Sequence, residues 1–345
     1  MNAILKVLDL TKHYPARGNW FAPRRVVHAL DGVSFTLAPG ETLAVVGESG
    51  CGKSTLARCL MRLVDPTSGS VLLGGIEIAS GDLLRMRALR RQMQIVFQDP
   101  YASLNPRRTV FQLLAEPLRL HRVCARHRRR THAAELLAAV GLRADFLDRH
   151  PHELSGGQRQ RVAIARALSL QPRVIICDEP VSGLDVSVQA QVINLLRRLQ
   201  RDEGMSYVFI SHDLGLVLRI AHRVAVMYLG QIVELADARA LAGRVMHPYS
   251  QALFSATPIA DPTVAASRRR IVLSGDLPSP IDLPTGCRFH MRCPYRQDMC
   301  VERKPELKQV EDRLVRCHFA GDPGFPPAAA PHGHAATSHS VGVPR

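Results

Sequence analysis

At 345 residues, the chain has room for one large α/β domain and an appendage, because globular domains average roughly 100 to 200 residues. Its composition, 46% hydrophobic and 22% charged residues, is enough to bury a sizeable core, which excludes global disorder. The balance of 45 Lys and Arg against 30 Asp and Glu gives a net charge of +15, which favours an anionic partner such as a nucleotide, a nucleic acid or an acidic membrane surface.

Membrane-spanning and secretory segments are not expected. No unbroken apolar run approaches the roughly 18 residues that cross a bilayer, so any association with a membrane is predicted to be peripheral. The first residues lack the basic stretch and long apolar run of a secretory signal. We therefore expect a reducing compartment, in which the eight cysteines are thiols or metal ligands before they are disulfides.

The first predicted elements are strands. Alternating apolar residues over 4–10 and 33–37 are typical of a half-buried sheet, and an Arg-rich, aromatic insertion separates the two. A compact apolar run at 42–46 predicts a buried strand, which enters a glycine loop at 47–52 and then a helix that begins near Lys53. Strand, glycine loop and helix in this order are the layout of a phosphate-binding site.

The middle of the chain is predicted to form a helical subdomain at about 100–170. Its sequence is basic, and apolar residues recur there at helical spacing: Leu113, Leu114, Leu118, Leu136, Leu137 and Val140. Two further buried strands are predicted at 174–177 and 207–210, with a helix at 187–201 between them. This alternation favours a mainly parallel sheet with helices on both faces.

After about residue 245 the composition shifts to Pro, Arg and Cys, and we place a boundary there. It divides the chain into a domain over 1–245, an extension over 246–320 and a tail over 321–345. The tail is rich in Pro, Ala, Gly and His and holds too few apolar residues to offset the entropy of ordering it. We expect it to be disordered.

The glycine loop matches the pattern G-x-x-x-x-G-K-[ST] in the context that this pattern requires. Its glycines let backbone N–H groups close around phosphates, while Lys53 supplies a positive charge and the Ser54 hydroxyl a ligand for Mg²⁺. The loop comprises Gly47, Glu48, Ser49, Gly50, Cys51, Gly52, Lys53 and Ser54.

Two carboxylates, Asp178 and Glu179, follow the buried strand at 174–177. They therefore emerge at the carboxyl end of a strand, where open α/β sheets bind their ligands. We expect Asp178 to hold Mg²⁺ and Glu179 to act as a general base on the attacking water.

A second glycine pair begins the helix predicted over 158–168. Ser155 and Gln158 fit a capping box, so a purely structural helix start is one interpretation. Gly156 and Gly157 also leave backbone donors free at the positive end of the helix, which favours a second anion site. The motif alone leaves both interpretations open.

Taken together, these motifs resemble those of ABC transporter ATPases. The resemblance rests on the phosphate loop, VFQDP, LSGGQRQR, VIICDEP, SGLD and ISHD, in that order. More narrowly, GESGCGKSTL, QDPYASLNPR, EPVSGLDVSVQAQ and HPYSQALFSATP resemble the ATP-binding subunits of bacterial dipeptide and oligopeptide importers. The resemblance covers about residues 1–320. It implies an α/β P-loop NTPase core with an antiparallel β subdomain and a helical subdomain, followed by a cysteine-containing extension.

The resemblance also implies roles for single residues around this chain's own ATP. His212 would contact the γ-phosphate and help to place Glu179 and the water, and Tyr14 would stack on the adenine. Mg²⁺ would be held by Ser54, Gln98 and Asp178. The remaining ATP-binding positions are those of the phosphate loop from Gly47 to Ser54, together with Thr55.

The same resemblance implies that ATP is sandwiched between two chains. The signature loop of one chain would face the ATP of its partner, and Asp185 would link the two sites. The signature loop comprises Leu154, Ser155, Gly156, Gly157 and Gln158. The segment 98–107 would receive a short helix from one of two membrane permease subunits. A separate extracytoplasmic protein would select the solute, and the complex would lie on the cytoplasmic face of the bacterial inner membrane.

Four cysteines, Cys287, Cys293, Cys300 and Cys317, are spaced C-x5-C-x6-C-x16-C in the extension. These spacings exceed those usual for structural zinc, and disulfides are not expected in a reducing compartment. The set resembles one with which ATPases of such importers bind a [4Fe–4S] cluster. Zinc and free buried thiols stay open as alternatives. Arg288, Arg292 and Arg316 are expected to offset the negative charge of such a site.

Two other functional classes compete with an importer ATPase. The charge of +15 would suit an ABC ATPase that acts on nucleic acid, but such relatives usually carry two cassettes or a long coiled-coil insertion. A non-enzymatic regulatory module conflicts with the presence of both Glu179 and Lys53. The sequence leaves open which solute is transported and whether the partner ATPase is identical or, as the resemblance favours, a related second chain.

Overall fold

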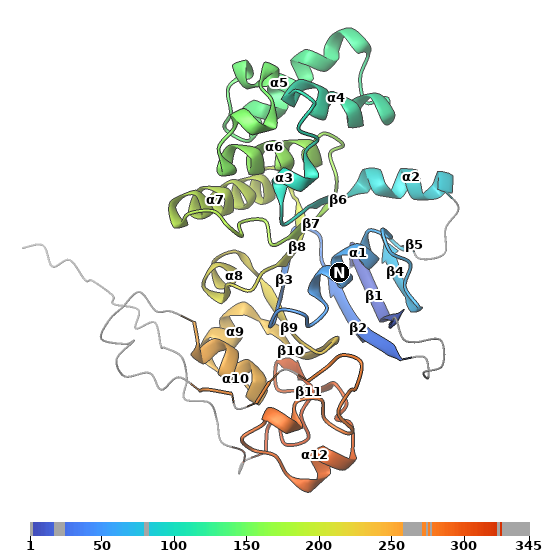
Figure 1. Ribbon diagram of the computed structural model, residues 1–345, viewed down its shortest axis with the longest axis vertical. Coiled ribbons are helices and arrows are strands. Elements are labelled where there is room, and N and C mark those ends of the chain that lie inside the picture. Colours follow the sequence, from blue (N-terminus) through green and yellow to red (C-terminus); the bar gives the residue numbers. More distant parts are fainter. Residues whose placement is uncertain are drawn as a thin grey trace, which may run out of the picture.

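The computed structural model describes residues 3–16, 25–78, 83–257, 271–273, 275–276, 278–322 and 325. Most of the expected disordered tail and part of the Arg-rich insertion lie outside these residues. Figure 1 shows three regions: a central sheet with a smaller antiparallel sheet beside it, a helical region at one end, and the C-terminal extension at the other.

The central sheet has eight strands in the order β11-β12-β10-β9-β3-β8-β7-β6. Its core is parallel, because β3 pairs in parallel with β8 and β9, and β7 with β8 and β6. β3 and β7 are buried along their whole length, as expected for strands covered on both faces. The strands of this parallel core are β3 (Thr42–Val46), β6 (Met93–Val96), β7 (Val174–Asp178), β8 (Ser206–Ile210) and β9 (Arg223–Tyr228).

The smaller sheet is antiparallel, with the order β2-β1-β4-β5. It consists of β1 (Leu5–Pro15), β2 (Val26–Leu37), β4 (Ser68–Leu73) and β5 (Ile76–Glu77). Val33, Phe35 and Leu37 alternate with more exposed residues on β2 and pack with Leu5 and Leu10 of β1 into one apolar core. β1 and β2 are longer than the sequence predicted, because they pair with each other as far as Pro15 and Val26.

Helices cover the central sheet and build the helical region. α1 (Lys53–Leu60) follows the phosphate loop, α2 (Leu83–Gln92) precedes β6, and α7 (Val186–Glu203) connects β7 to β8. The helical region contains α3 (Pro100–Ser103), α4 (Val110–Leu120), α5 (Arg129–Ala139), α6 (Gly156–Leu168) and the short turns η1 (Arg126–Arg128), η2 (Ala144–Asp148) and η3 (Pro151–Glu153). The six apolar positions expected there are all buried, and five of them, all but Leu118, belong to one cluster, which confirms their pattern.

The extension returns to the central sheet. α8 (Leu214–Ile220), β10 (Gln231–Asp237) and α9 (Ala238–Gly243) complete the region before residue 245. The following elements are α10 (Pro248–Ser255), η4 (His290–Arg292), α12 (Asp298–Glu302), β11 (Lys308–Val310) and β12 (Arg313–Val315). β12 pairs with β10 and with β11, so the last strands continue the same sheet. Within the described ranges, no helix has the length and apolar character needed to cross a bilayer.

Candidate nucleotide site

The residues predicted to bind the chain's own nucleotide meet at one edge of the parallel sheet. Gly47 follows β3, Gln98 lies just beyond β6, Asp178 ends β7, and His212 lies just beyond β8. Because parallel strands end at the same edge, their loops line a common hollow of about 650 Å³. Its lining includes Tyr14, Ser49, Gly50, Gly52, Lys53, Ser54, Thr55, Gln98, Glu179 and His212, all of which the sequence predicted, and also Val27, Ala29, Ser182 and Pro280, which it did not.

The phosphate loop closes on itself around the Lys53 ammonium. Lys53 is only 6% exposed and donates hydrogen bonds to the carbonyl oxygens of Gly47 (2.8 Å) and Glu48 (3.0 Å). A Cβ at Gly47 would lie 2.3 Å from the Met227 carbonyl oxygen, so this position requires glycine. α1 begins at Lys53 without a side-chain cap, and its first N–H groups remain available to an anion.

Ser54 and Asp178 place two oxygen atoms side by side, as possible metal ligands. The Ser54 hydroxyl donates to Asp178 Oδ1 over 3.3 Å, and Asp178 is 6% exposed. Burial raises the pKa of the Asp178 carboxyl, and the hydrogen bond from Ser54 opposes that rise in part. A buried carboxylate beside a hydroxyl is a donor set that suits Mg²⁺, a hard cation that prefers oxygen.

Glu179 contacts two other polar side chains of the site. Its Oε2 accepts a hydrogen bond from Gln98 Nε2 (3.0 Å) and lies 3.2 Å from His212 Nδ1. The Glu179 side chain is 15% exposed, whereas that of His212 is 62% exposed and faces the open hollow. Three residues were expected to bind Mg²⁺. Ser54 and Asp178 are hydrogen-bonded to each other, whereas the amide of the third, Gln98, is directed at Glu179.

The signature loop lies away from this hollow. None of residues 154–158 is among its lining residues. Ser155 caps α6, and its hydroxyl and the Gln158 side chain each bond to the backbone of the other. A Cβ at Gly157 would lie 2.4 Å from Val188 Cγ1, so the start of α6 packs closely on α7. Asp185 caps α7 and accepts from the Val188 N–H over 2.9 Å.

The four cysteines of the extension are neighbours. Burial raises the pKa of Cys287 to about 12, and the proximity of the other three cysteines also raises it. In the described part of the chain, no three His, Cys, Asp or Glu side chains are placed to hold a metal ion. The expected iron–sulfur ligands are thus brought together without forming a ready ligand set.

The arginines expected to offset the charge of a cluster also have partners other than the cysteines. Arg292 pairs with Glu48, and Arg288 pairs with Asp31 and the Leu229 carbonyl. Arg316 donates to the carbonyl oxygens of Ile232 and Pro305. Their chain positions beside cysteines gave no signal of these contacts.

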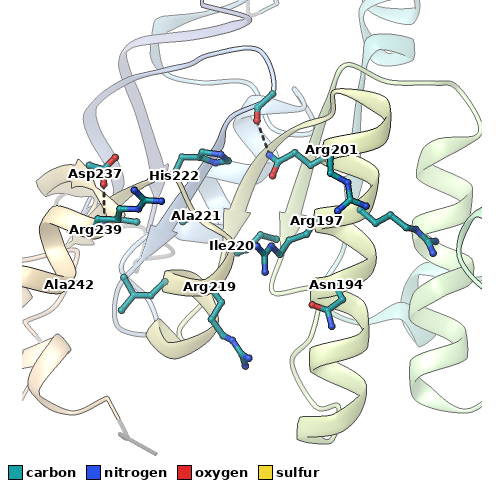
Figure 2. Close-up of a pocket in the computed structure, with 15 residues that line it drawn as sticks. Asn194, Arg197, Arg201, Arg219, Ile220, Ala221, His222, Asp237, Arg239 and Ala242 are labelled. Atoms are coloured by element: carbon teal, nitrogen blue, oxygen red, sulfur yellow. Dashed lines mark hydrogen bonds between the residues drawn. The ribbon is translucent and has the colours of Figure 1, made fainter. Parts of the chain in front are cut away.

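A second hollow, of about 1080 Å³, lies at the opposite edge of the sheet, near the amino ends of β3 and β9. Figure 2 shows Arg197 and Arg201 on α7, Arg219 near the end of α8 and Arg239 on α9 around it. Arg201 and Arg219 belong to the last turns of α7 and α8, where a positive charge complements the helix dipole. This hollow contains none of the predicted site residues.

Known proteins match both regions of the chain. The family described as ABC transporter matches residues 30–182, and the family described as oligopeptide/dipeptide transporter, C-terminal region, matches residues 233–300. A probable peptide ABC transporter ATP-binding protein of Sinorhizobium fredii is 52% identical over 100% of this chain and 96% of its own. The dipeptide transport ATP-binding protein DppF of Escherichia coli is 52% identical over 92% of this chain and 95% of its own.

Solved structures agree with these matches. The dimeric, post-hydrolysis ATP-binding cassette MJ0796, bound to ADP and Pi, superposes with a TM-score of 0.61 at 31% identity, over 68% of this chain and 99% of that one. Fold and site therefore define an ATP-hydrolysing cassette of the ABC class. The chain belongs to the family of ABC transporter ATP-binding proteins that carry the oligopeptide/dipeptide transporter C-terminal region. The fold and family expected from the sequence are confirmed.

Proposed function

We propose that this ATPase drives the import of dipeptides, oligopeptides or related small solutes through a separate membrane permease. The similarity to peptide-transport subunits along nearly the whole chain supports this proposal. In it, two permease subunits and an extracytoplasmic solute-binding protein complete the transporter. The ATPase lies peripherally on the cytoplasmic face of the bacterial inner membrane, and its partner ATPase is a related chain.

ATP is proposed to bind between two ATPase chains. The phosphate loop, Asp178, Glu179 and His212 serve the nucleotide of their own chain, while residues 154–158 and Asp185 serve the partner. The exposure of the signature loop supports this division, because Ser155 and Gly156 are exposed and outside the chain's own hollow. Val186, beside Asp185, is 81% exposed, an unusual position for an apolar side chain unless another surface covers it.

Hydrolysis is proposed to depend on the group around Glu179. Its carboxylate takes a proton from a water that attacks the γ-phosphate, and Gln98 and His212 hold the carboxylate in place from two neighbouring strand ends. Lys53 turns from the loop carbonyls toward the phosphates when ATP enters. Ser54 and Asp178 would hold Mg²⁺, which would supply positive charge to offset that of the phosphates. Tyr14, which lines the same hollow, stacks on the adenine.

The segment 98–107 is proposed to receive the permease. α3 begins there with Asp99 as its cap, and Tyr101 on α3 is 52% exposed. Arg159 of α6 lies over the Tyr101 ring at 5.1 Å, so this surface touches the helix that begins at the signature loop. Gln98 joins the same segment to Glu179. A movement of the docked helix could therefore be transmitted through few residues to Glu179 and to the helix that begins at the signature loop.

The experiment that tests the proposal is isolation of the native complex from its own membranes. Mild detergent extraction should recover the chain with two permease subunits and a second ATPase chain. Peptides should then stimulate ATP hydrolysis when the solute-binding protein is added to the reconstituted complex. Recovery with RNA and without a permease would contradict the proposal.

We propose, separately, that the four cysteines bind a [4Fe–4S] cluster. The clustering of Cys287, Cys293, Cys300 and Cys317 in the extension supports it, since the Cys287 N–H is bonded to the Cys300 carbonyl over 2.8 Å, and the thiols must move to form the ligand set. Protein purified without oxygen should be brown and contain about four iron and four sulfide per chain. A Cys300→Ser variant should lose both. Folded wild-type protein that is colourless and free of iron would overturn the proposal.

A further inference from the structure

The extension touches the phosphate loop directly. Arg292 Nη1 lies 2.8 Å from Glu48 Oε2, and Nη2 lies 3.2 Å from Oε1, which is a two-pronged ion pair. The Arg292 side chain is 10% exposed and that of Glu48 is 30% exposed. Such shielded, two-pronged pairs hold a fixed geometry, unlike most ion pairs on a protein surface. Glu48, expected from the sequence to bind ATP, is thus engaged by the extension.

A second contact fixes the same residue through its main chain. The Glu48 N–H donates to the hydroxyl of Tyr249 over 2.8 Å, and Tyr249 is fully buried in α10. The Tyr249 ring lies 4.7 Å from that of Tyr228 on β9 and 5.6 Å from that of Phe289. This aromatic cluster connects the core sheet, α10 and the segment that carries Arg292. The loop residue is therefore held from two sides by residues beyond 245.

The extension also borders the other end of the nucleotide hollow. Pro280 is one of its lining residues, and the Pro280 carbonyl accepts from the His28 N–H over 2.9 Å. Arg288 pairs with Asp31, farther along the same strand, β2. Contacts at β2 and at the phosphate loop together fix the position of the extension against the site.

We infer that the extension holds the phosphate loop in its nucleotide-binding conformation through the Arg292–Glu48 ion pair, so that the conformation of the cysteine segment and the affinity for ATP are linked. Arg292 is a positioning residue in this inference. It also neutralises a carboxylate that would otherwise repel the triphosphate. The link to the cysteines is short, because η4 places Arg292 between Cys287 and Cys293, and the Cys287 N–H is bonded to the Cys300 carbonyl.

The inference rests on the proposed binding of ATP at this loop. The ATP site and the role of the ion pair are tested by different variants, so the inference can be wrong while the ATP site is correct. Lys53→Ala tests the site, since loss of the ammonium should abolish measurable binding. Arg292→Met tests the ion pair and should weaken ATP binding about tenfold, raising KM with kcat changed less than about twofold. Arg296→Met is the matched control: Arg296 is exposed in the same segment, four residues beyond Arg292, and should leave ATP affinity unchanged.

A double variant separates positioning from general damage. Glu48→Gln combined with Arg292→Met removes the unpaired carboxylate, so ATP affinity should recover to within about threefold of wild type. Arg292→Lys retains the charge without the two-pronged geometry, and its affinity should fall between those of wild type and Arg292→Met. An affinity in Arg292→Met equal to that of wild type, with Lys53→Ala inactive, would overturn the inference and leave the ATP site intact.

Hydrogen exchange provides a readout that does not depend on the stability of a variant. Linkage is reciprocal, so ATP with Mg²⁺ should slow amide exchange over residues 286–300 in the full-length wild-type chain. Arg292→Lys should reduce this protection, and Arg296→Met should retain it. If ATP protects the phosphate loop of the wild type but not residues 286–300, the extension is not linked to the site and the inference is wrong.

Discussion

Glu179 adopts a backbone conformation that few residues other than glycine adopt, with φ of +49°. Its N–H is bonded to the Ile210 carbonyl over 3.0 Å, so the neighbouring strand β8 stabilises this conformation. Residues held in this region are often constrained for function. Here the conformation places a carboxylate between Gln98 and His212 at the edge of the sheet.

Replacing Glu179 by Gln keeps the size of the side chain and removes its ability to accept a proton. We expect ATP hydrolysis to fall at least about a hundredfold, with ATP binding retained, because a general base contributes on that order to the rate. Steady-state phosphate release and equilibrium binding measure the two effects. Glu203→Gln, an exposed position at the end of α7, is the control. Undiminished hydrolysis in Glu179→Gln would rule out the assigned role.

His247 should make the free energy of unfolding depend on pH. Burial lowers the pKa of His247 to about 3, whereas an unfolded histidine titrates near 6.5. Between these values the unfolded chain binds the extra proton, so stability is fully present above about 6.5 and is lost as pH falls below it. The free energy of unfolding therefore falls by about 1.4 kcal/mol for each pH unit below 6.5, or by about 2 kcal/mol at pH 5.

The matched variant is His247→Asn, because His247 caps α10 through Nδ1 and Asn also caps helices. Glu234, which accepts from the His247 N–H, has a pKa raised by burial and acts with the opposite sign, but it is present in both proteins. Denaturant unfolding at pH 7 and pH 5 should show a smaller loss in the variant. Equal losses would show that the histidine carries no such linkage.

At the scale of elements, the start of α6 can be changed without loss of its cap. Ser155→Asp keeps an N-cap oxygen and adds a negative charge where the partner's phosphates are proposed to lie. ATP binding by the variant chain should match wild type, while hydrolysis by the assembled ATPase should fall more than about tenfold, because like charges repel. Ser155→Asn, which caps without the charge, should lose less. Weaker binding of ATP by the variant's own hollow would contradict the division of roles.

The sequence predicted the elements around the site well because their signals are local. The apolar runs of β3, β7 and β8, and the residues directly after them, specify strands and strand ends within a few positions. Since parallel strands end at one edge, the meeting of Lys53 and Asp178 followed from the pattern alone, whereas His212 was expected there from the family resemblance. The ends of β1 and β2 were not predicted, because they depend on pairing with each other and not on their own alternation.

The parts of the site that come from the extension could not be predicted. The contact between Arg292 and Glu48 joins residues 244 positions apart, and neither residue belongs to a pattern that names its partner. Pro280 likewise reaches the hollow from a segment without periodicity. The motif HPYSQALFSATP did mark the region, and within it Tyr249 bonds to the phosphate loop. The spacing of residues within the motif nevertheless did not predict that Tyr249 would contact the phosphate loop.

At the scale of the whole molecule, charge and contacts divide between two ends of the sheet. The carboxyl ends of the strands carry the nucleotide site and receive the extension, while the amino ends carry the arginine-lined hollow. Figure 1 shows the extension and the helical region on opposite sides of the central sheet. A net charge of +15 suggested an anionic partner, and the phosphate loop provides such a site with a single buried lysine.

The pairing of β12 with β10 affects any attempt to prepare a shortened ATPase. If the chain were cut after α9, the unpaired N–H and C=O groups of Glu234 and Leu235 would be left bare along a flank of the sheet. An uncovered flank of this kind is a template for intermolecular strand addition, and the fragment would be prone to aggregate. A minimal soluble version should therefore keep the chain through Val315, or replace outward-facing apolar residues of β10 with charged ones.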